Sequence, residues 1–255
     1  MPLSDKTLKS ESKQTRVLYF TGCYAGYIKP EIGNALLSVL RKLNIAVIMP
    51  DQFCCGLPLM TKGMVRQAKR KIDANLSKWY HLLHQVDHIV VTCSSCGLAL
   101  MQEWQVLIND NRLKKIRAKI IHASRLISRH LEEVNMRDHR YRTKDPVGRW
   151  HLAYHMPCHL KVQPRAASSI ELLSSLPGVD LNVLESHCCG MAGTWGMMTA
   201  NYPLSRIMGS HLMSLLNSKT TKGVVTDCPT CALQLNHFNG PPVYHPIEVV
   251  DRTLP

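Results

Sequence analysis

The stretch "HIVVTCSSCGLAL" (88–100) has a second, altered copy in the chain, "GVVTDCPTCALQL" (223–235), and this pair decides how the chain is organised. In each copy a short run of β-branched residues leads directly into a Cys-x-x-Cys motif. Such a run is typical of a buried strand. The cysteines therefore follow the end of a strand in both halves.

The flanking segments repeat in the same way. "RVLYFTGC" (16–23) matches "HLAYHMPC" (151–158), and "IAVIMPDQFCCG" (45–56) matches "LNVLESHCCG" (181–190). The cysteines of the two halves correspond at offsets of 134 or 135 residues. A fixed offset of this kind marks repeated structural units, so the chain is a tandem duplication. The ten cysteines are Cys23, Cys54, Cys55, Cys93, Cys96, Cys158, Cys188, Cys189, Cys228 and Cys231.

Short apolar runs alternate with longer segments of helical spacing, which predicts an α/β fold with mostly parallel sheets. Ligand sites of such sheets lie at the carboxyl ends of the strands, where the cysteines would gather. We expect two tandem α/β lobes with a cysteine cluster at the strand ends of each. The predicted strands are Val17–Phe20, Ala46–Met49, Ile89–Val91, Leu152–Tyr154, Leu181–Leu184 and Val224–Thr226. The predicted helices are Pro30–Leu43, Met64–His84, Ala166–Leu176 and Pro203–Leu216.

The predicted boundaries are a flexible N-terminus (1–15), a first repeat (16–108), a basic connecting segment (109–149) and a second repeat (150–255). The connecting segment carries 12 Lys+Arg against 5 Asp+Glu. Its part from Leu113 to Leu131 has apolar residues at helical spacing, which predicts a helix. The part from Arg137 to Arg149 reads as a loop. The whole segment is either a solvated helix with a linker or a face that docks a membrane or an acidic partner.

Composition limits the class of protein. The chain has 255 residues, of which 45% are hydrophobic, so a large core is feasible. Its formal net charge of +13 favours an acidic partner, which is nucleic acid, an anionic membrane surface or an acidic subunit. No apolar run reaches the length of a membrane span, and the polar first residues lack the apolar region of a signal peptide. We expect a cytoplasmic protein.

Four uses of the cysteines are open. Disulfides fit poorly, because two pairs are vicinal and a cytoplasmic compartment is reducing. A four-cysteine zinc site built from the two Cys-x-x-Cys motifs would leave six cysteines unused. Catalytic thiols without metal are a third use. Iron–sulfur ligation accounts best for the number and spacing, since thiolates are the usual cluster ligands. Five cysteines per repeat exceed the four that a cubane needs.

Other residues near the cysteines are further candidates. Gly56, Gly190 and Gly193 would let the backbone turn and bring N–H groups close to sulfur, or they serve ordinary turns. Histidines beside the cysteines of the second repeat would hydrogen-bond to sulfur or carry protons. Alternatively, they are hydrogen-bonded or solvent-facing side chains without such a role. Asp227 is a proton donor or a turn residue. The candidate histidines and aromatic residues are His155, His159, His187, Trp195 and Tyr202.

At these residues the sequence resembles the cysteine-rich CCG domain family, with the signature Cys-x(n)-Cys-Cys-Gly-x(n)-Cys-x-x-Cys. The family includes the B-type subunit of heterodisulfide reductase, the glycolate oxidase iron–sulfur subunit and the C-type subunit of anaerobic glycerol-3-phosphate dehydrogenase. Both signatures are complete, and the resemblance covers nearly the whole chain. "YFTGCYAGYIKPEIG", "CCGMAGTWG" and "HPIEVVDRTL" are most similar to the C-terminal part of the last of these proteins.

The resemblance implies two [4Fe–4S] clusters of the noncubane type, one for each set of five cysteines. The sequence contains nothing that resembles a dinucleotide fingerprint, a P-loop or a flavin site, so we expect no flavin or nucleotide in this chain. The resemblance also implies an electron-transfer subunit of a respiratory dehydrogenase, which passes electrons from a flavin subunit to membrane quinone on the cytoplasmic face. The chain lacks the ferredoxin-like Cys-x2-Cys-x2-Cys-x3-Cys-Pro run, so a ferredoxin-like protein or domain would be a further partner.

Two other functions stay open. A subunit similar to the B-type subunit of heterodisulfide reductase would itself cleave a disulfide at a noncubane cluster. A zinc-stabilised basic protein would bind nucleic acid, although no recognition helix or RNA-binding motif supports this, and we expect no nucleic-acid partner.

Overall fold

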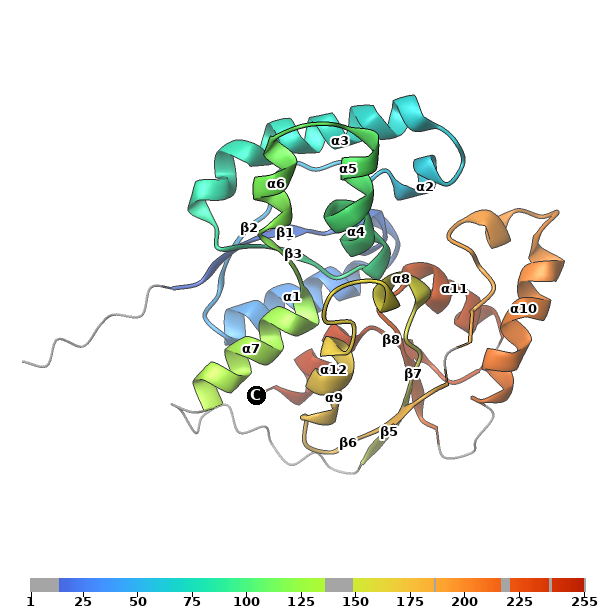
Figure 1. Cartoon of the computed structure of the whole chain (residues 1–255). Coiled ribbons are helices and arrows are strands. Elements are labelled where there is room, and N and C mark those ends of the chain that lie inside the picture. Colours follow the sequence, from blue (N-terminus) through green and yellow to red (C-terminus); the bar gives the residue numbers. More distant parts are fainter. Residues whose placement is uncertain (1–13, 136–148, 186, 217–220, 239, 255) are drawn as a thin grey trace, which may run out of the picture.

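A computed structural model describes residues 14–135, 149–185, 187–216, 221–238 and 240–254. The chain forms two four-stranded sheets, one in each half (Figure 1). Their strand orders are β2-β1-β3-β4 and β6-β5-β7-β8, and all pairs of neighbouring strands are parallel. The two sheets thus have the same topology. This confirms the predicted α/β class and the two tandem lobes.

The strands of both lobes are short, and the first three of each lobe lie in the repeated apolar runs that lead into the cysteines. In the first lobe they are β1 (Arg16–Phe20), β2 (Ala46–Ile48), β3 (His88–Val91) and β4 (Ile120–His122). In the second lobe they are β5 (Trp150–Tyr154), β6 (Val179–Val183), β7 (Gly223–Val225) and β8 (Val243–Tyr244).

Helices cover both faces of each sheet. Those of the first lobe are α1 (Pro30–Lys42), α2 (Leu57–Met60), α3 (Val65–Trp79), α4 (Ser94–Leu98), α5 (Trp104–Leu107), α6 (Arg112–Arg117) and α7 (Ala123–Asn135). Those of the second are α8 (Cys158–Lys161), α9 (Ser168–Ser174), α10 (Tyr202–Ser214), α11 (Pro229–His237) and α12 (Pro246–Thr253). The π-helical turns η1 (Tyr24–Ile28) and η3 (Ala99–Glu103) precede α1 and α5, and the 3₁₀ turns η2 (Tyr80–Gln85) and η5 (Trp195–Met197) follow α3 and precede α10.

The two lobes share one hydrophobic core. Helix α1 packs against α12 and α7 packs against α9, and Figure 1 shows these helices in the space between the two sheets. Buried side chains from both lobes, such as Tyr19, Leu36, Tyr154 and Ile247, belong to a single apolar cluster. Burial of this surface favours the association of the lobes by the same hydrophobic effect that favours each fold.

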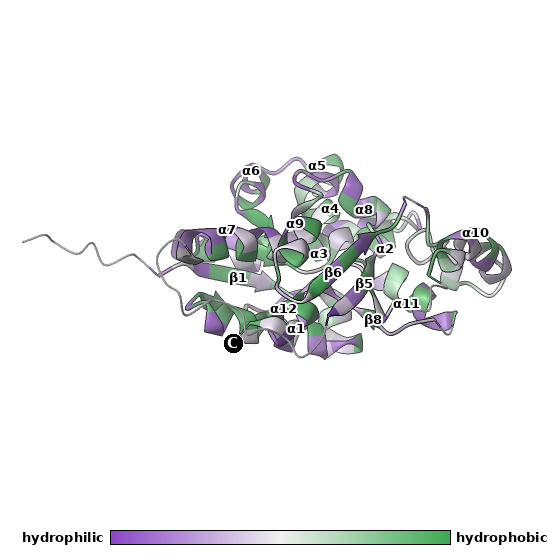
Figure 2. Ribbon diagram, turned by 90° about the horizontal axis from the view of Figure 1, so that it is seen from below, coloured by the Kyte–Doolittle hydropathy of each residue, from purple (hydrophilic) through white to green (hydrophobic). Residues whose placement is uncertain are grey.

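Successive side chains of β1 point to opposite faces of the first sheet and pack into two different hydrophobic clusters. Val17 and Tyr19 point into the shared core, whereas Leu18 and Phe20 belong to a separate cluster on the outer face. A strand buried on both faces reads as a continuous apolar run, as the sequence shows here. Figure 2 shows that helices α6 and α7, in contrast, carry both hydrophobic and hydrophilic residues.

Polar contacts add to the shared core at one side of the interface. The Lys29 ammonium lies 2.7 Å from the Glu248 carboxylate, and both groups are partly or largely buried. Lys42 Nζ donates to the carbonyl oxygens of Asp251 and Leu254 at 2.8 and 3.0 Å. Both lysines belong to the first lobe and all their partners here to the second. The Lys29 contact lies near the start of α12 and the Lys42 contacts near its end, so both ends of α12 are joined to the α1 region.

The segment Leu113–Leu131 is not one helix, as its spacing predicts, but two helices separated by strand β4. Ile120 and Ile121 lie beside Ile89 and Val90 of β3 in the first sheet. The sheet offers these residues backbone partners that local helical spacing does not reveal. The sequence also does not predict β8, which has two residues, or α12 after it. The predicted loop from Arg137 lies almost wholly outside the described residues, as does most of the predicted flexible N-terminus.

Within the described part of the chain, no helix combines the length and the apolar composition that a bilayer span requires.

Replacement of Ile247 by alanine tests the shared core. Ile247 is fully buried in α12, so the Ile247→Ala variant should lose about 2–5 kcal/mol of unfolding free energy. Ile207 on α10 is 68% exposed, and Ile207→Ala should change stability by less than about 0.5 kcal/mol. Urea unfolding under anaerobic conditions measures both. Because the core is shared, we expect one transition for both lobes, and separate transitions would contradict it.

Candidate metal centres

The cysteines of the first lobe converge from three strand ends. Cys23 follows β1, the pair Cys54 and Cys55 follows β2, and Cys93 and Cys96 follow β3. The carboxyl ends of parallel strands meet at one edge of the sheet, so side chains far apart in sequence are brought together there. Cys55 and Cys96 are buried at this edge, whereas Cys23 is exposed.

Backbone N–H groups in the first lobe point at sulfur. Gly56 donates to Cys54 Sγ at 3.5 Å, and Cys96 donates to Cys93 Sγ at 3.4 Å. Gly56 adopts a φ of 86°, which favours glycine because it has no Cβ. Donors aimed at sulfur stabilise the thiolate form, which is the form that binds metals.

The five sulfurs of the first lobe form one connected group. The thiols of Cys23 and Cys55 donate to the sulfur of Cys54, and this lowers the pKa of Cys54 far below its ordinary value. The same contacts raise the pKa of Cys23 and of Cys55. Contacts with Cys55 and Cys93 raise the pKa of Cys96. Neighbouring sulfurs cannot all ionise without a compensating cation, so the group suits a metal centre.

The second lobe repeats this arrangement. Gly190 donates its N–H to Cys188 Sγ at 3.3 Å, as Gly56 does to Cys54. The Cys231 thiol lies 3.1 Å from Cys189 Sγ. Its donation to Cys228 is the main cause that lowers the pKa of Cys228 to about 6, against the opposing effect of burial. The contact of Cys188 with Cys189 lowers the pKa of Cys189 in the same way.

Cys158 is the least connected of the ten. Its side chain is exposed, and the pKa of its thiol is raised mainly by desolvation and then by the neighbouring charges of Cys228 and Cys189. It lies near the other sulfurs of its lobe but without a thiol hydrogen bond to them among the described residues. It therefore stays a predicted ligand that the geometry places at the edge of the group.

A family model for the cysteine-rich domain CCG matches residues 17–101 and 152–236, which contain the two groups of sulfurs. The chain belongs to the CCG family. Each lobe thus contains one CCG domain, and each match covers the first three strands of its sheet in chain order and all five cysteines of its lobe.

Named relatives match nearly the whole chain but are longer. The C-type subunit of anaerobic glycerol-3-phosphate dehydrogenase from Escherichia coli K12 is 31% identical over 94% of this chain and 59% of its own length. The B-type subunit of fumarate reductase (CoM/CoB) from Methanothermobacter marburgensis is 26% identical over 87% of this chain and 42% of its own. The chain therefore spans about half the length of these relatives. A putative Asp/Glu racemase structure from Yersinia pestis aligns over 93% of this chain and 96% of its own, at 11% identity and a TM-score of 0.38, too low to support an argument.

The second CCG domain offers a nitrogen ligand that the first lacks. Ligand atoms of His155, Cys189 and Cys231 all lie within 4.8 Å of one another, and all three residues are buried. His155 Nε2 is buried and has no hydrogen-bond partner among the described residues, although buried polar atoms are normally paired. The corresponding position of the first repeat is Phe20. The sequence draws attention to His155 as a neighbour of the cysteines, and the structure places it among them.

Hydrogen bonds and ring contacts engage three of the other candidate side chains. His159 Nδ1 is 2.9 Å from Ser95 Oγ, which links the second lobe to the loop of Cys93 and Cys96. His187 stacks edge-on against His211, with ring centres 4.0 Å apart. The Tyr202 hydroxyl group lies 3.3 Å from His237 Nδ1, and Trp195 is exposed.

The Cys-x-x-Cys loops of the two CCG domains are hydrogen-bonded to each other. Ser94 N–H donates to the carbonyl oxygen of Asp227 at 3.1 Å, and His245 Nε2 lies 2.8 Å from the carbonyl oxygen of Thr92. The Asp227 carboxylate is fully buried and accepts from Tyr154 Oη at 2.5 Å. The backbone carbonyl of Asp227 thus joins the two loops, while its carboxylate anchors the second loop to Tyr154.

A cavity of about 200 Å³ opens on the first group of sulfurs. Cys23, Cys55, Cys93 and Cys96 line it on one side, and Gly193 is among the second-lobe residues on the other. The space suits an inorganic group bound to these sulfurs, and both CCG domains enclose it. Gly193 thus lines a space next to the first group of cysteines.

Gly22 is a site residue that sequence reasoning misses. Its φ is 66°, and a Cβ at this position would lie 3.0 Å from Cys96 Sγ. The backbone before Cys23 therefore approaches the sulfur more closely than a side chain allows. The "TGC" sequence after a strand is the only signal for it, and the second repeat has Pro157 at the corresponding position.

Gly190 should tolerate no side chain. A Cβ there would lie 2.0 Å from the carbonyl oxygen of Ser205, and φ is 87°. We expect Gly190→Ala to lose about 2–5 kcal/mol of unfolding free energy through backbone strain and overpacking. Gly63 has a similar φ of 71° with nothing within 4 Å, so Gly63→Ala should lose only about 1–2 kcal/mol. Equal losses in urea unfolding would contradict the steric account.

Proposed function

We propose that the chain is an iron–sulfur electron-transfer subunit of a respiratory dehydrogenase, with one [4Fe–4S] cluster of noncubane type in each CCG domain. The observation that carries the proposal is the convergence of five sulfurs in each lobe, with backbone N–H groups directed at sulfur in both. Thiolates are the usual ligands of iron–sulfur clusters, and over the described residues the potential metal-binding group at these sulfurs contains cysteine and histidine without the carboxylates that magnesium and calcium prefer.

The proposed ligands of one cluster are Cys23, Cys54, Cys55, Cys93 and Cys96, and those of the other are Cys158, Cys188, Cys189, Cys228 and Cys231. The clusters, when bound, supply one-electron transfer. The chain would set the reduction potentials of the clusters through N–H groups that donate to sulfur, through burial of the inner cysteines, and through the close approach of Gly22 to Cys96. Gly56 and Gly190 belong to this proposed cluster shell as backbone donors.

Hydrogen bonds between the two Cys-x-x-Cys loops support a path for electrons between the centres. Only a few atoms separate the Cys93 loop from Asp227, which directly precedes Cys228. Neither loop can move without loss of these contacts, so the proposed centres are held at a constant separation. Small movement at the ligands favours electron transfer because little reorganisation accompanies a change of charge.

The proposed partners follow from the relatives. One of them is named as a subunit of anaerobic glycerol-3-phosphate dehydrogenase. We propose that a flavin-containing subunit donates electrons, that a ferredoxin-like protein or domain relays them, and that membrane quinone accepts them on the cytoplasmic face. The net charge of +13 favours contact with anionic lipid, and exposed apolar side chains such as Tyr27 and Ile28 lie close after Cys23.

Metal analysis of anaerobically purified protein tests the cluster content. We expect about eight irons and eight acid-labile sulfides per chain, the content of two four-iron clusters. Cys96→Ser and Cys231→Ser each remove a buried sulfur from a different lobe, and each should reduce the iron content to about four. Each variant is the control for the other, because the remaining iron should give a different paramagnetic resonance spectrum. Zinc without sulfide would contradict the proposal.

Reoxidation of the reduced protein tests the electron acceptor. The dithionite-reduced chain should be reoxidised by a water-soluble quinone, and its cluster absorption should return at a rate that rises with quinone concentration. An aliphatic disulfide is the matched alternative acceptor and should leave the reduced spectrum unchanged. Reoxidation by the disulfide and not by the quinone would replace electron transfer to quinone with disulfide reduction.

A further inference from the structure

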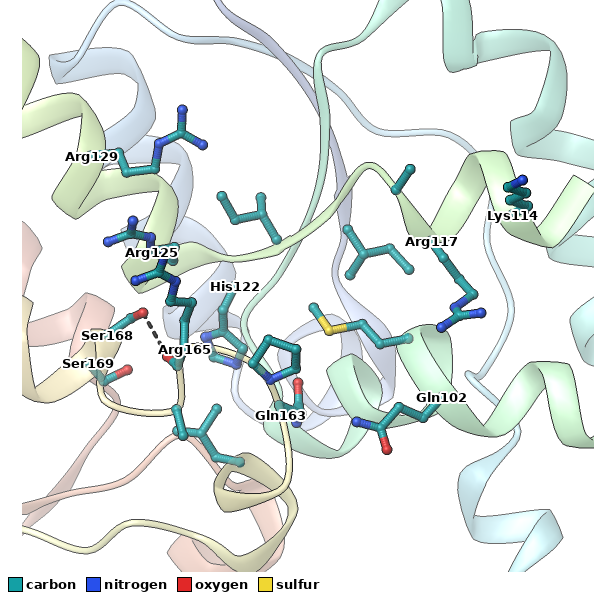
Figure 3. A pocket seen from close by; sticks show the side chains of 17 residues that line it. Gln102, Lys114, Arg117, His122, Arg125, Arg129, Gln163, Arg165, Ser168 and Ser169 are labelled. Carbon is teal, nitrogen blue, oxygen red and sulfur yellow. Dashed lines mark hydrogen bonds between the residues drawn. The ribbon is translucent and has the colours of Figure 1, made fainter.

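A second cavity, of about 670 Å³, lies away from the sulfurs, on the side of the molecule where α6, β4 and α7 meet the loop after α8 (Figure 3). Its volume is in the range of small-molecule sites. Five of its lining side chains are cationic. We call it the arginine cavity, and its cations are Lys114, Arg117, Arg125, Arg129 and Arg165.

The arginine cavity concentrates positive charge without neutralising it. Its lining, taken over the described residues, includes no aspartate or glutamate. Among those same residues, none of its five cations forms a salt bridge. Arg117 donates to the side-chain oxygen of Gln105, which is neutral. Like charges in a concave site repel one another and attract an anion strongly.

His122 supplies a second and independent sign of a ligand. It is the last residue of β4, is only 8% exposed, and lines the arginine cavity. Its Nε2 atom has no hydrogen-bond partner among the described residues, while its Nδ1 atom lies 3.8 Å from the Asp227 carboxylate. An unpartnered buried nitrogen is costly. In the tautomer with its proton on Nε2, the ring would donate to an oxygen of a bound anion.

Arg165 adopts a backbone conformation that is strained for a residue with a side chain. Its φ is 61°, in the left-handed region where a glycine would fit without strain. Its carbonyl oxygen accepts from Ser168 Oγ at 2.7 Å, so the loop is held from within. Figure 3 shows the side chains of Arg125, from α7, and Arg165 on the same side of the cavity.

We propose that the arginine cavity is a binding site for a phosphate-bearing small molecule, held between Arg125 of the first lobe and Arg165 of the second. Guanidinium groups bind phosphate oxygens through two parallel hydrogen bonds, which lysine cannot do. The hydroxyl groups of Ser168 and Ser169 already donate within the protein, so the arginines and His122 are the donors to the ligand.

The ligand would touch the contacts that hold both cysteine loops. Gln163 lines the arginine cavity and donates to the carbonyl oxygen of Ser94, between Cys93 and Cys96, at 2.6 Å. Ser169 also lines it and donates to the Asp227 carboxylate at 2.7 Å. Since its anchors come from both lobes, the ligand stabilises their association.

Titration of the full chain with inorganic pyrophosphate, in a chloride buffer of low ionic strength, tests the proposal by calorimetry. We expect saturable binding of one pyrophosphate per chain and a rise in Tm with its concentration. The double variant Arg125→Ala, Arg165→Gly should bind at least about tenfold more weakly, since a single charged hydrogen bond contributes about that factor.

The control is a double variant with the same loss of charge elsewhere. Arg66 and Arg70 lie exposed on α3, outside the arginine cavity, so Arg66→Ala, Arg70→Ala should bind pyrophosphate as the unaltered chain does. Equal weakening in both double variants would mean general attraction to a basic protein and would overturn the proposal. Absence of saturable binding to the unaltered chain would overturn it too.

Two further measurements are needed. The first distinguishes loss of a ligand contact from loss of stability, and the second distinguishes a small-molecule site from a lipid-binding surface. Arg165→Gly alone removes the guanidinium and the backbone strain together, so its Tm without pyrophosphate should equal or exceed that of the unaltered chain, while its affinity falls. Retained affinity would exclude Arg165 as a contact.

Phosphatidylglycerol vesicles present the same phosphate chemistry on a flat surface. Binding to vesicles that depends on Arg125 and Arg165, without binding to pyrophosphate, would overturn the small-molecule site and assign these arginines to lipid instead.

Discussion

The burial of four helices between two sheets is the constraint on which the rest of the structure depends. Helices α1, α7, α9 and α12 cannot hide their apolar faces within one lobe, so the two lobes close over a single core. This packing sets the carboxyl edges of both sheets against each other. The contact between the Ser94 amide and the Asp227 carbonyl, which joins the two cysteine loops, exists only because the lobes are held in this position.

Duplication accounts for the similarity of the two sulfur groups, and later divergence accounts for their differences. In both, a glycine with positive φ turns its N–H toward the first cysteine of the vicinal pair. Around them the surroundings differ: Phe20 in the first lobe corresponds to buried His155 in the second, and Gly22 corresponds to Pro157. A nitrogen near one group and a close backbone approach at the other would give the two proposed centres unequal potentials.

Part of the positive charge of the chain gathers at one place in the structure. The segment after residue 109 is rich in lysine and arginine, and the sequence leaves open whether this is a solvated helix or a docking face. The structure places strand β4 inside it, and β4 brings His122 and the cations of α6 and α7 to one cavity. Arg165 joins them from the other lobe. The charge is therefore partly concentrated in a concave site rather than spread over a helix surface.

The sequence by itself determined the duplication, the α/β class, the six main strands and the ten cysteines, because each is a local pattern repeated at a constant offset. It could not determine β4 and β8, whose few residues become strands only through hydrogen bonds to β3 and β7. Nor could it place Gly22 against Cys96, or Arg125 near Arg165. Those contacts join residues far apart in the chain, and only the tertiary packing of strands within a sheet and of one lobe on the other brings them within reach.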